Sequence, residues 1–322
     1  RSFGDRAGLI ARIETFTQDS GLPLSLKNFI GYYHLDPRSI YGKFSFSRLC
    51  ADAGVCDDFA EPAESILTKA FSKLVAVDSR RWIKFLTDIL PRFSCELAAS
   101  LPDFEKRMLQ MFYITVFQEA ADWRSHTAQA NMQLLADSPI MMHELYALLA
   151  LNLERIDFID QPVPLGFDCP LDLHCTYTRD QILIAMDYMT PKNVREGVKW
   201  LPDKQVDVFF ITLNKADKDY SPTTMYNDYS INESLFHWQS QSRTSDTAST
   251  GQRYINHRQR GSRVVLFVRE FKQDSIGAAP YTCLGTAAYV KHTGSRPMNI
   301  TWHLDQPIPA KYLRKTNKLV VG

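Results

Sequence analysis

The segment MYNDYSINESLFHWQSQSR, residues 225–243, concentrates aromatic rings beside hydrogen-bonding groups. A flat aromatic ring is a platform on which a nucleobase can stack, and a neighbouring acid or amide can bind the pairing edge of that base. The carboxylate of Asp228 is an acceptor suited to the exocyclic N4 amino group of cytosine. We therefore predict a base pocket formed by Tyr226, Asp228, Tyr229 and Trp238.

Residues 236–241 alternate between two kinds of side chain. Successive side chains of a β-strand point to opposite faces, so we expect one row to enter the core and the other to face the ligand. The alternative that the aromatic rings are simply core residues stays open. The first row is Phe236, Trp238 and Ser240, and the second is His237, Gln239 and Gln241.

The segment RVVLFVREFK ends with Glu270 and Lys272 in E-x-K spacing. A Mg²⁺-dependent nuclease needs carboxylates on the metal and a lysine beside the attacked phosphate. With Asp228 or Asp207 as the second acid, these residues form an alternative catalytic site. Charged residues often end a strand without any catalytic role, so our main prediction names no catalytic residue and no metal site.

Motifs for other chemistry are missing from the sequence. There is no Gly-rich loop ending in Gly-Lys-Ser/Thr, no G-x-G-x-x-G after a strand and no G-x-S-x-G. His143 and Glu144 begin a zinc-protease helix motif, but Ala147 stands where the second His is required. We expect no cofactor and no enzymatic activity of this chain alone.

The formal net charge of +1 hides an asymmetry along the chain. From residue 250 onward there are 12 Lys and Arg against 3 Asp and Glu, whereas the preceding residues hold 25 against 33. A basic end suggests a surface that faces a polyanion, although the same groups could instead meet the acidic part of the chain. The predicted DNA contacts are His237, Gln239, Gln241, Arg243, Arg253, Arg258, Arg260, Lys291 and Arg296.

The elements that must position these residues fall into two parts, and we predict an α+β multidomain fold. Residues 1–158 show helical periodicity, as in SILTKAFSKLVAV and DFEKRMLQMFYITVF, and predict an all-α coupler or scaffold. The proline-rich residues 159–174 predict a linker. Residues 175–322 begin with a capping box at Thr178 and Gln181 and continue as strands. In MNITWHLD, apolar residues alternate with a polar outer row, so we expect a mainly β domain with a curved sheet or barrel.

The cellular context can also be predicted. The 6 cysteines show no paired C-x-x-C spacing, and no apolar run is long enough to span a bilayer. The N-terminus RSFGDRAGLI lacks an initiator Met and a secretory core. We expect a cytoplasmic fragment of a longer polypeptide with no membrane partner.

The strings TLNK and FHWQSQ, within residues 208–245, and the later PYTCLGTAAYVKHTGSRPMNITWHLDQPIP resemble a domain of formerly unknown function. That domain is attached to the C-terminus of DEAD/DEAH-box helicases. LPLSLKNFIGYYHLDPRSIYGKFSFSRLCADAGV resembles the helical region that precedes it, so the resemblance covers nearly the whole chain. Related architectures include bacterial SauUSI-type modification-dependent (type IV) restriction enzymes, in which a nuclease and a helicase motor precede these parts.

The resemblance implies a target-recognition module for phage defence. Its partner is double-stranded DNA that carries 5-methylcytosine or 5-hydroxymethylcytosine. We expect an SRA- or PUA-like domain that flips the base out, and a helical unit that couples it to the motor or only spaces the two. ATP and Mg²⁺ belong to the helicase and nuclease domains of the same polypeptide, and a homodimer is possible at full length. A protein-interaction module of a helicase remains the second alternative.

Overall fold

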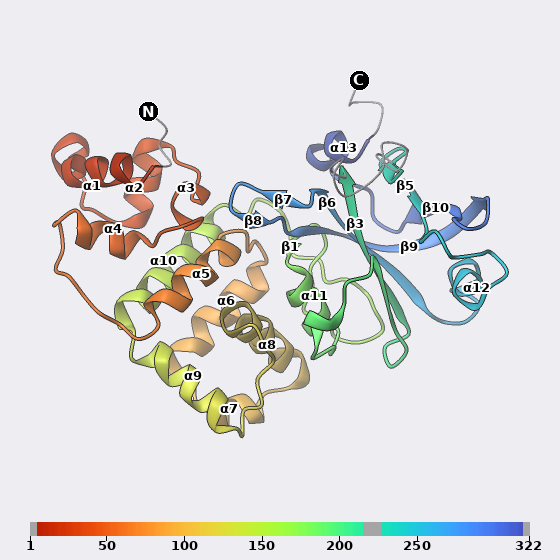
Figure 1. The fold of residues 1–322 in the computed structure, drawn as a ribbon, viewed down its shortest axis with the longest axis horizontal. Coiled ribbons are helices and arrows are strands. Elements are labelled where there is room, and N and C mark those ends of the chain that lie inside the picture. Colours follow the sequence, from red (N-terminus) through yellow and green to blue (C-terminus); the bar gives the residue numbers. More distant parts are fainter. Residues whose placement is uncertain (1–4, 215–226, 318–322) are drawn as a thin grey trace. The chain divides into compact units, whose positions relative to one another are not determined.

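The computed structural model describes residues 5–214 and 227–317 (Figure 1). Within it the chain divides into two compact units. The first comprises residues 1–159 with residues 275–277, and the second comprises residues 160–274 and 278–322. An N-terminal helical region followed by a mixed-sheet domain confirms the predicted fold class.

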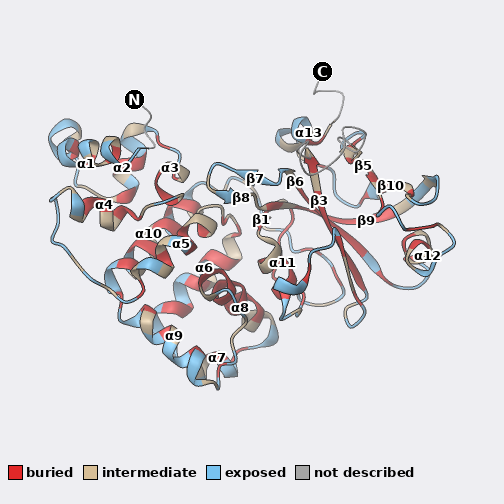
Figure 2. Ribbon diagram, viewed as in Figure 1, coloured by how far each residue is buried: buried red, intermediate tan, exposed pale blue. Residues whose placement is uncertain are grey.

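The first unit is an array of helices, as its periodicity predicts. In the segment SILTKAFSKLVAV, residues at helical spacing are buried, namely Leu67, Ala70, Phe71 and Leu74. Every residue from Arg107 to Val116 of α8 is buried, so this part of the helix is enclosed on all sides (Figure 2). The elements are α1 (Arg6–Ser20), α2 (Leu26–Tyr33), α3 (Arg38–Tyr41), α4 (Phe46–Asp52), α5 (Glu64–Leu74), α6 (Arg80–Ile89), η1 (Leu90–Arg92), α7 (Cys95–Ser100), α8 (Asp103–Phe117), α9 (His126–Ala136) and α10 (Pro139–Glu154).

Glu144 of α10 has a structural role in this unit. Its carboxylate accepts hydrogen bonds from the backbone N–H groups of Phe46, at 2.8 Å, and Ser47, at 2.6 Å. These N–H groups belong to the first turn of α4 and have no partner within that helix. The buried acid next to His143 therefore fastens one helix to another.

The second unit is built on an eight-stranded sheet whose main path has the order β2-β3-β6-β9-β10-β5-β4, with β1 paired to β9. β3 and β6 run parallel and the other pairs run antiparallel. The described strands form an open sheet with edges at β2 and β4. They are β1 (Thr176–Tyr177), β2 (Val198–Leu201), β3 (Val206–Asn214), β4 (Tyr229–Ser230), β5 (Leu235–Gln239), β6 (Arg263–Phe271), β9 (Tyr281–Thr293) and β10 (Asn299–Leu304), beside the small hairpin β7 (Gln273–Asp274) and β8 (Gly277–Ala278).

One face of this sheet, here called the core face, carries a large apolar cluster. Phe209, Trp238, Leu266 and Trp302 belong to it. Tyr254 of α12 (Ser249–Asn256) and Leu313 of α13 (Ala310–Thr316) pack against it. The opposite face, here called the second face, is covered at β3 and the start of β9 by the segment that contains α11 (Arg179–Ala185) and η2 (Pro191–Asn193).

The prediction of a linker at residues 159–174 was wrong. Residues 160–174 belong to the second unit, and Val163, Leu165, Leu171 and Leu173 among them are buried. A methyl group of Leu173 lies so close to Gly285 of β9 that a Cβ there would meet it at 2.7 Å. The prolines therefore belong to a segment that packs on the sheet. Proline-rich turns occur in linkers and in packed segments alike, so the composition did not separate the two.

His174, which precedes β1, makes the stability of the second unit depend on pH. Burial, together with the positive charge of Lys311, lowers the pKa of His174 to about 4. Its Nε2 is buried without a hydrogen-bond partner among the described residues. Because unfolded histidine titrates near pH ~6.5, the stability that comes from the neutral ring is complete above that pH and is lost as pH falls towards 4.

We expect the urea concentration at the midpoint of unfolding to decrease when the pH is lowered from 7 to 4.5. The variant His174→Asn is expected to show a smaller decrease. Asparagine suits the test because the residue has φ 65°, a conformation that asparagine tolerates. The measurement is urea denaturation of both proteins across this pH range. An equal pH dependence in the two proteins would contradict the assignment to His174.

No single helix among the described residues has the length and apolar character of a membrane span. α9 and α10, which meet at a bend of 83°, pass that test only when they are taken together.

Candidate nucleic-acid interface

Polar side chains line the second face of the sheet at the strands β9, β10, β5 and β4. β10 alternates as its sequence predicts: Ile300, Trp302 and Leu304 are buried in the core face. The intervening residues Asn299, Thr301 and His303 therefore point to the second face. We call the polar part of this second face, from β9 to β4, the polar sheet face.

A continuous row of four residues crosses the polar sheet face. Thr301 of β10 is paired with Lys291 of β9 on one side and with His237 of β5 on the other. His237 is in turn paired with Tyr229 of β4. Paired residues share a face, so the four side chains form one line about 14 Å long at the usual spacing of strands.

Tyr229 and His237 form the aromatic part of this row. Their rings are stacked, with centroids 4.7 Å apart and planes inclined by 16°. Nδ1 of His237 lies 2.7 Å from the carbonyl oxygen of Asn227, which fixes the orientation of the imidazole. Both side chains are half-buried, so each keeps part of its surface accessible. The pair can offer a flat surface to a planar ligand.

A ladder of amides runs beside the aromatic pair. Asn227 Nδ2 donates to Gln239 Oε1 at 3.0 Å, and Gln239 Nε2 donates to Asn299 Oδ1 at 3.3 Å. Asp228 Oδ1 accepts from the backbone N–H of Gln239 at 2.8 Å and is buried. The amides hold one another in place, and such groups can hydrogen-bond to the edges of bases.

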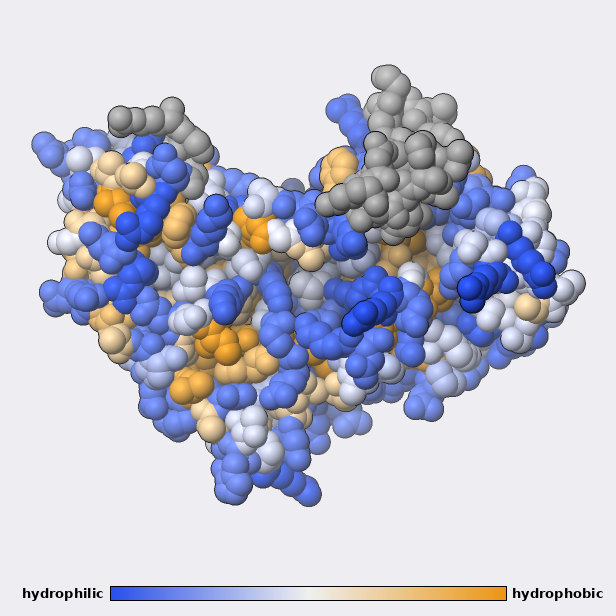
Figure 3. Space-filling view, in the orientation of Figure 1, coloured by the Kyte–Doolittle hydropathy of each residue, from blue (hydrophilic) through white to orange (hydrophobic). Residues whose placement is uncertain are grey.

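Exposed cations lie near the far end of the β9–β10 hairpin. The backbone N–H of Arg296 donates to the carbonyl oxygen of Thr244 at 2.9 Å, which brings Arg243 and Arg296 close in space. Arg243, Lys291 and Arg296 are all exposed. Strongly hydrophilic side chains are visible on the surface in the region of α12 and β9 (Figure 3).

The structure does not assemble the base pocket that the sequence predicts. Trp238 is in the core face, where its ring lies 4.4 Å from that of Phe209 and 5.5 Å from that of Tyr254, centroid to centroid. Tyr229 lies on the opposite face of the same sheet, so the two rings cannot line one pocket. Asp228 is occupied in part by the backbone of β5. Tyr226 lies outside the described residues.

Some predicted DNA contacts are engaged within the protein instead. Arg253 forms a two-point ion pair with Asp207, at 2.8 Å and 2.9 Å, and lies over the ring of Trp200. Gln241 Oε1 accepts from the hydroxyl of Tyr254 at 3.3 Å. These two residues are therefore structural. His237, Gln239, Arg243, Lys291 and Arg296 are at or beside the polar sheet face, while Arg258 and Arg260 are exposed in the loop before β6.

The acids required for the alternative nuclease site do not converge. Asp207 is paired with Val264 at the start of β6, whereas Glu270 is six residues further along that strand, about 20 Å away. Asp228 is bonded to Gln239 at the end of β5, and Gln239 lies level with Asn299 of β10 and Thr293 at the end of β9. Glu270 instead follows Val268, which is paired with Thr282 at the start of β9. In the part of the chain that the structure describes, no group of three His, Cys, Asp or Glu could hold a metal ion.

Asn299, Thr301 and His303 are absent from the predicted site, although the alternation of MNITWHLD indicates their outward direction. What the sequence did not show is that β10 lies between β9 and β5, because residues 237 and 301 are paired across 64 positions of the chain. The sequence therefore indicated that these three side chains point outward, but it did not indicate that they lie beside the aromatic segment.

A search of curated proteins gives no match for the chain. Residues 171–315 match the model of a family described as "Domain of unknown function (DUF3427)", and that range contains all eight described strands of the main sheet.

Proposed function

We propose that the second unit binds double-stranded DNA through the polar sheet face and selects a modified cytosine there. The observation that carries the proposal is the row Lys291–Thr301–His237–Tyr229, in which an exposed cation and a half-buried stacked aromatic pair share one face on either side of the buried Thr301. Cations bind phosphates without reading sequence, and rings and amides contact bases.

The energies indicate what each part must contribute. Stacking of a base on an aromatic side chain stabilises a complex by about 1–3 kcal/mol, whereas flipping a base out of the duplex costs a few kcal/mol. The aromatic pair alone therefore cannot stabilise a flipped base, and hydrogen bonds from Gln239 and Asn299 supply the remainder. A 5-methyl group adds only about 0.8 kcal/mol of apolar contact, so we expect modest selectivity for 5-methylcytosine.

The resemblance to helicase C-terminal regions supports a place for this unit in a larger enzyme. In our proposal, the helical unit connects the DNA-binding unit to helicase and nuclease domains of the same polypeptide, where ATP and Mg²⁺ act. A protein-interaction module is the rival function, with Tyr229 as an interface anchor. The polar character of the face and its neighbouring cations favour a polyanionic partner over a protein.

Tyr229→Ala is expected to weaken DNA binding by roughly 10- to 100-fold, because it removes the outer ring of the stacked pair. The measurement is a titration of the whole chain, without Mg²⁺, against one duplex that carries cytosine, 5-methylcytosine or 5-hydroxymethylcytosine. Two salt concentrations give the number of phosphate contacts, since the logarithm of the binding constant falls by about 0.9 per contact for each tenfold rise in salt.

Lys291→Ala is expected to reduce this salt dependence by about one phosphate contact.

Two variants serve as matched controls for the ring and for the charge. Phe271→Ala removes an exposed ring at the end of β6, and Arg195→Ala removes an exposed cation before β2. Neither is expected to change affinity. Equal affinity for the three duplexes would remove the modified base from the proposal, and no salt-dependent binding at all would favour the protein-interaction module.

A further inference from the structure

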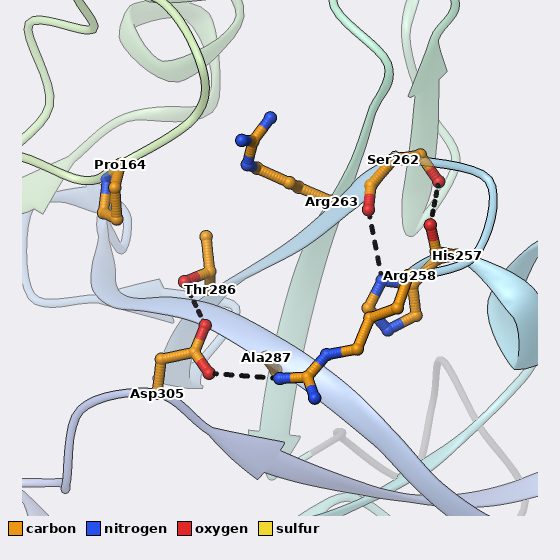
Figure 4. Close-up of a pocket in the computed structure, with 9 residues that line it drawn as sticks. Pro164, His257, Arg258, Ser262, Arg263, Thr286, Ala287 and Asp305 are labelled. Carbon is orange, nitrogen blue, oxygen red and sulfur yellow. Dashed lines mark hydrogen bonds and ion pairs between the residues drawn. The ribbon is translucent and has the colours of Figure 1, made fainter.

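A separate pocket lies on the second face of the sheet, where β10 ends and β6 begins. Its volume is about 390 Å³, and the side chains around it include Pro164, Arg258, Arg263, Thr286 and Asp305. Figure 4 shows these five side chains arranged around an open space, with the guanidinium of Arg258 extended towards Asp305. The lining residues come from four segments that are distant in sequence, so the pocket is a product of the fold.

The two arginines give this pocket the chemistry that suits an anion. Arg258 pairs with Asp305 at 3.8 Å, and one N–H of Arg263 donates to the carbonyl oxygen of Leu165 at 3.4 Å. A guanidinium has five N–H donors in a planar fork, a geometry that matches phosphate oxygens. Asp305 Oδ2 accepts from the hydroxyl of Thr286 at 2.6 Å, so its charge is already shared with a donor and a cation. The charged groups of the lining sum to an excess of one positive charge.

His257 holds the loop that carries Arg258. Its Nδ1 lies 3.2 Å from the carbonyl oxygen of Ser262, and its Nε2 accepts from the backbone N–H of Tyr289 at 3.1 Å. Burial lowers the pKa of His257, which favours the neutral ring that these two contacts require. The imidazole therefore acts as a positioning residue that fastens residues 257–262 to β9.

The pocket and the polar sheet face lie on the same side of the sheet. Asp305, the first residue after β10, accepts a hydrogen bond from Thr286, which alternates with the core-face residue Ala287, and Arg263 alternates with the core-face residue Val264. From Thr301 to Asp305 is four residues, about 13 Å along an extended strand. His237 and Tyr229 lie one and two strands further across the sheet, so the pocket is separated from the aromatic pair both along and across the strands.

We propose that this pocket binds one phosphate group of the nucleic-acid backbone, at a fixed distance from the base that meets Tyr229 and His237. The inference rests on the proposed DNA binding and adds a second, discrete anchor to it. Arg258 and Arg263 contact the phosphate oxygens, and Asp305 orients Arg258 towards them. Two anchors at a set distance fix the register of the duplex on the sheet.

Neutralising single phosphates of the duplex tests this anchor. A series of duplexes is prepared, each with one uncharged methylphosphonate at a different position relative to the modified cytosine. For the unaltered chain, we expect roughly tenfold weaker binding when the substitution lies at one particular position relative to that base. In the Arg258→Ala/Arg263→Ala variant, binding is weaker for the unsubstituted duplex, and the loss at that position disappears.

Arg195→Ala, which removes an exposed cation outside the pocket, is the matched control and should keep the position-specific loss. Circular dichroism establishes that each variant is folded, and Arg258→Lys/Arg263→Lys keeps the charge while it removes the planar fork. A loss that is spread evenly over all positions, or that persists in the Arg258→Ala/Arg263→Ala variant, would overturn the anchor while the proposed function stands. If the unaltered chain binds none of the duplexes, the proposed function itself fails.

Discussion

Asp207→Ala is expected to lower the free energy of unfolding of the second unit by about 3–5 kcal/mol. The side chain of Asp207 is fully buried, and its two oxygens accept from Nε and Nη2 of Arg253. Burial raises the pKa of Asp207, while the guanidinium opposes that rise. Removing the carboxylate leaves Arg253 almost buried without its partner, over the ring of Trp200. Urea denaturation followed by tryptophan fluorescence measures the difference.

The double variant Asp207→Ala/Arg253→Met separates this ion pair from other effects of the substitution. Replacing a whole buried pair by apolar side chains is often close to neutral, so we expect the double variant to recover most of the lost stability. A single variant that unfolds at the same urea concentration as the unaltered chain would contradict the structural role. If it instead lost Mg²⁺-dependent DNA cleavage while it stayed folded, Asp207 would be a catalytic acid.

Trp238→Ala is expected to reduce stability by about 3–5 kcal/mol, the usual range for removing a large aromatic side chain from a core. The ring of Trp238 is only 5% exposed and packs against Phe209 and Tyr254. Trp238→Phe keeps a ring in that cluster and should therefore retain DNA binding. The two measurements are urea denaturation and the duplex titration on the same protein samples.

Tyr229→Ala is the natural comparison for Trp238, because the two residues lie on opposite faces of adjacent strands. Tyr229 is half-buried, so we expect its loss to affect stability less and DNA affinity more. The reverse pattern, in which Trp238→Phe loses selectivity for modified cytosine without loss of stability, would place the base-binding surface on the core face.

Local patterns in the sequence predicted the elements correctly because those patterns act over a few residues. The capping box at Thr178 and Gln181 is formed at the start of α11. The alternation in residues 236–239 places Phe236 and Trp238 in the core and His237 and Gln239 towards the surface. Side chains two residues apart in a strand share a face whatever the strand pairs with, so this part needs no tertiary information.

Local patterns could not decide which charged groups are available. Arg253 and Arg243 are equivalent as cations in the sequence, yet Arg253 is paired with the buried Asp207 and Arg243 is exposed. The difference depends on where α12 packs on the sheet. An ion pair between residues 46 positions apart has no signature in either segment, so its existence follows only from the packed structure.

The sequence by itself determined a helical unit, a β unit, and the inward and outward residues of individual strands. Only the tertiary structure decided the strand order and register, and with them the row that joins Lys291, Thr301, His237 and Tyr229. It also showed that Trp238, predicted to line the base pocket, is a core residue, and that Arg253, predicted to contact DNA, is paired with Asp207. The physical reason is that strand pairing satisfies backbone hydrogen bonds between distant segments, and a shift of one residue would turn every side chain to the other face.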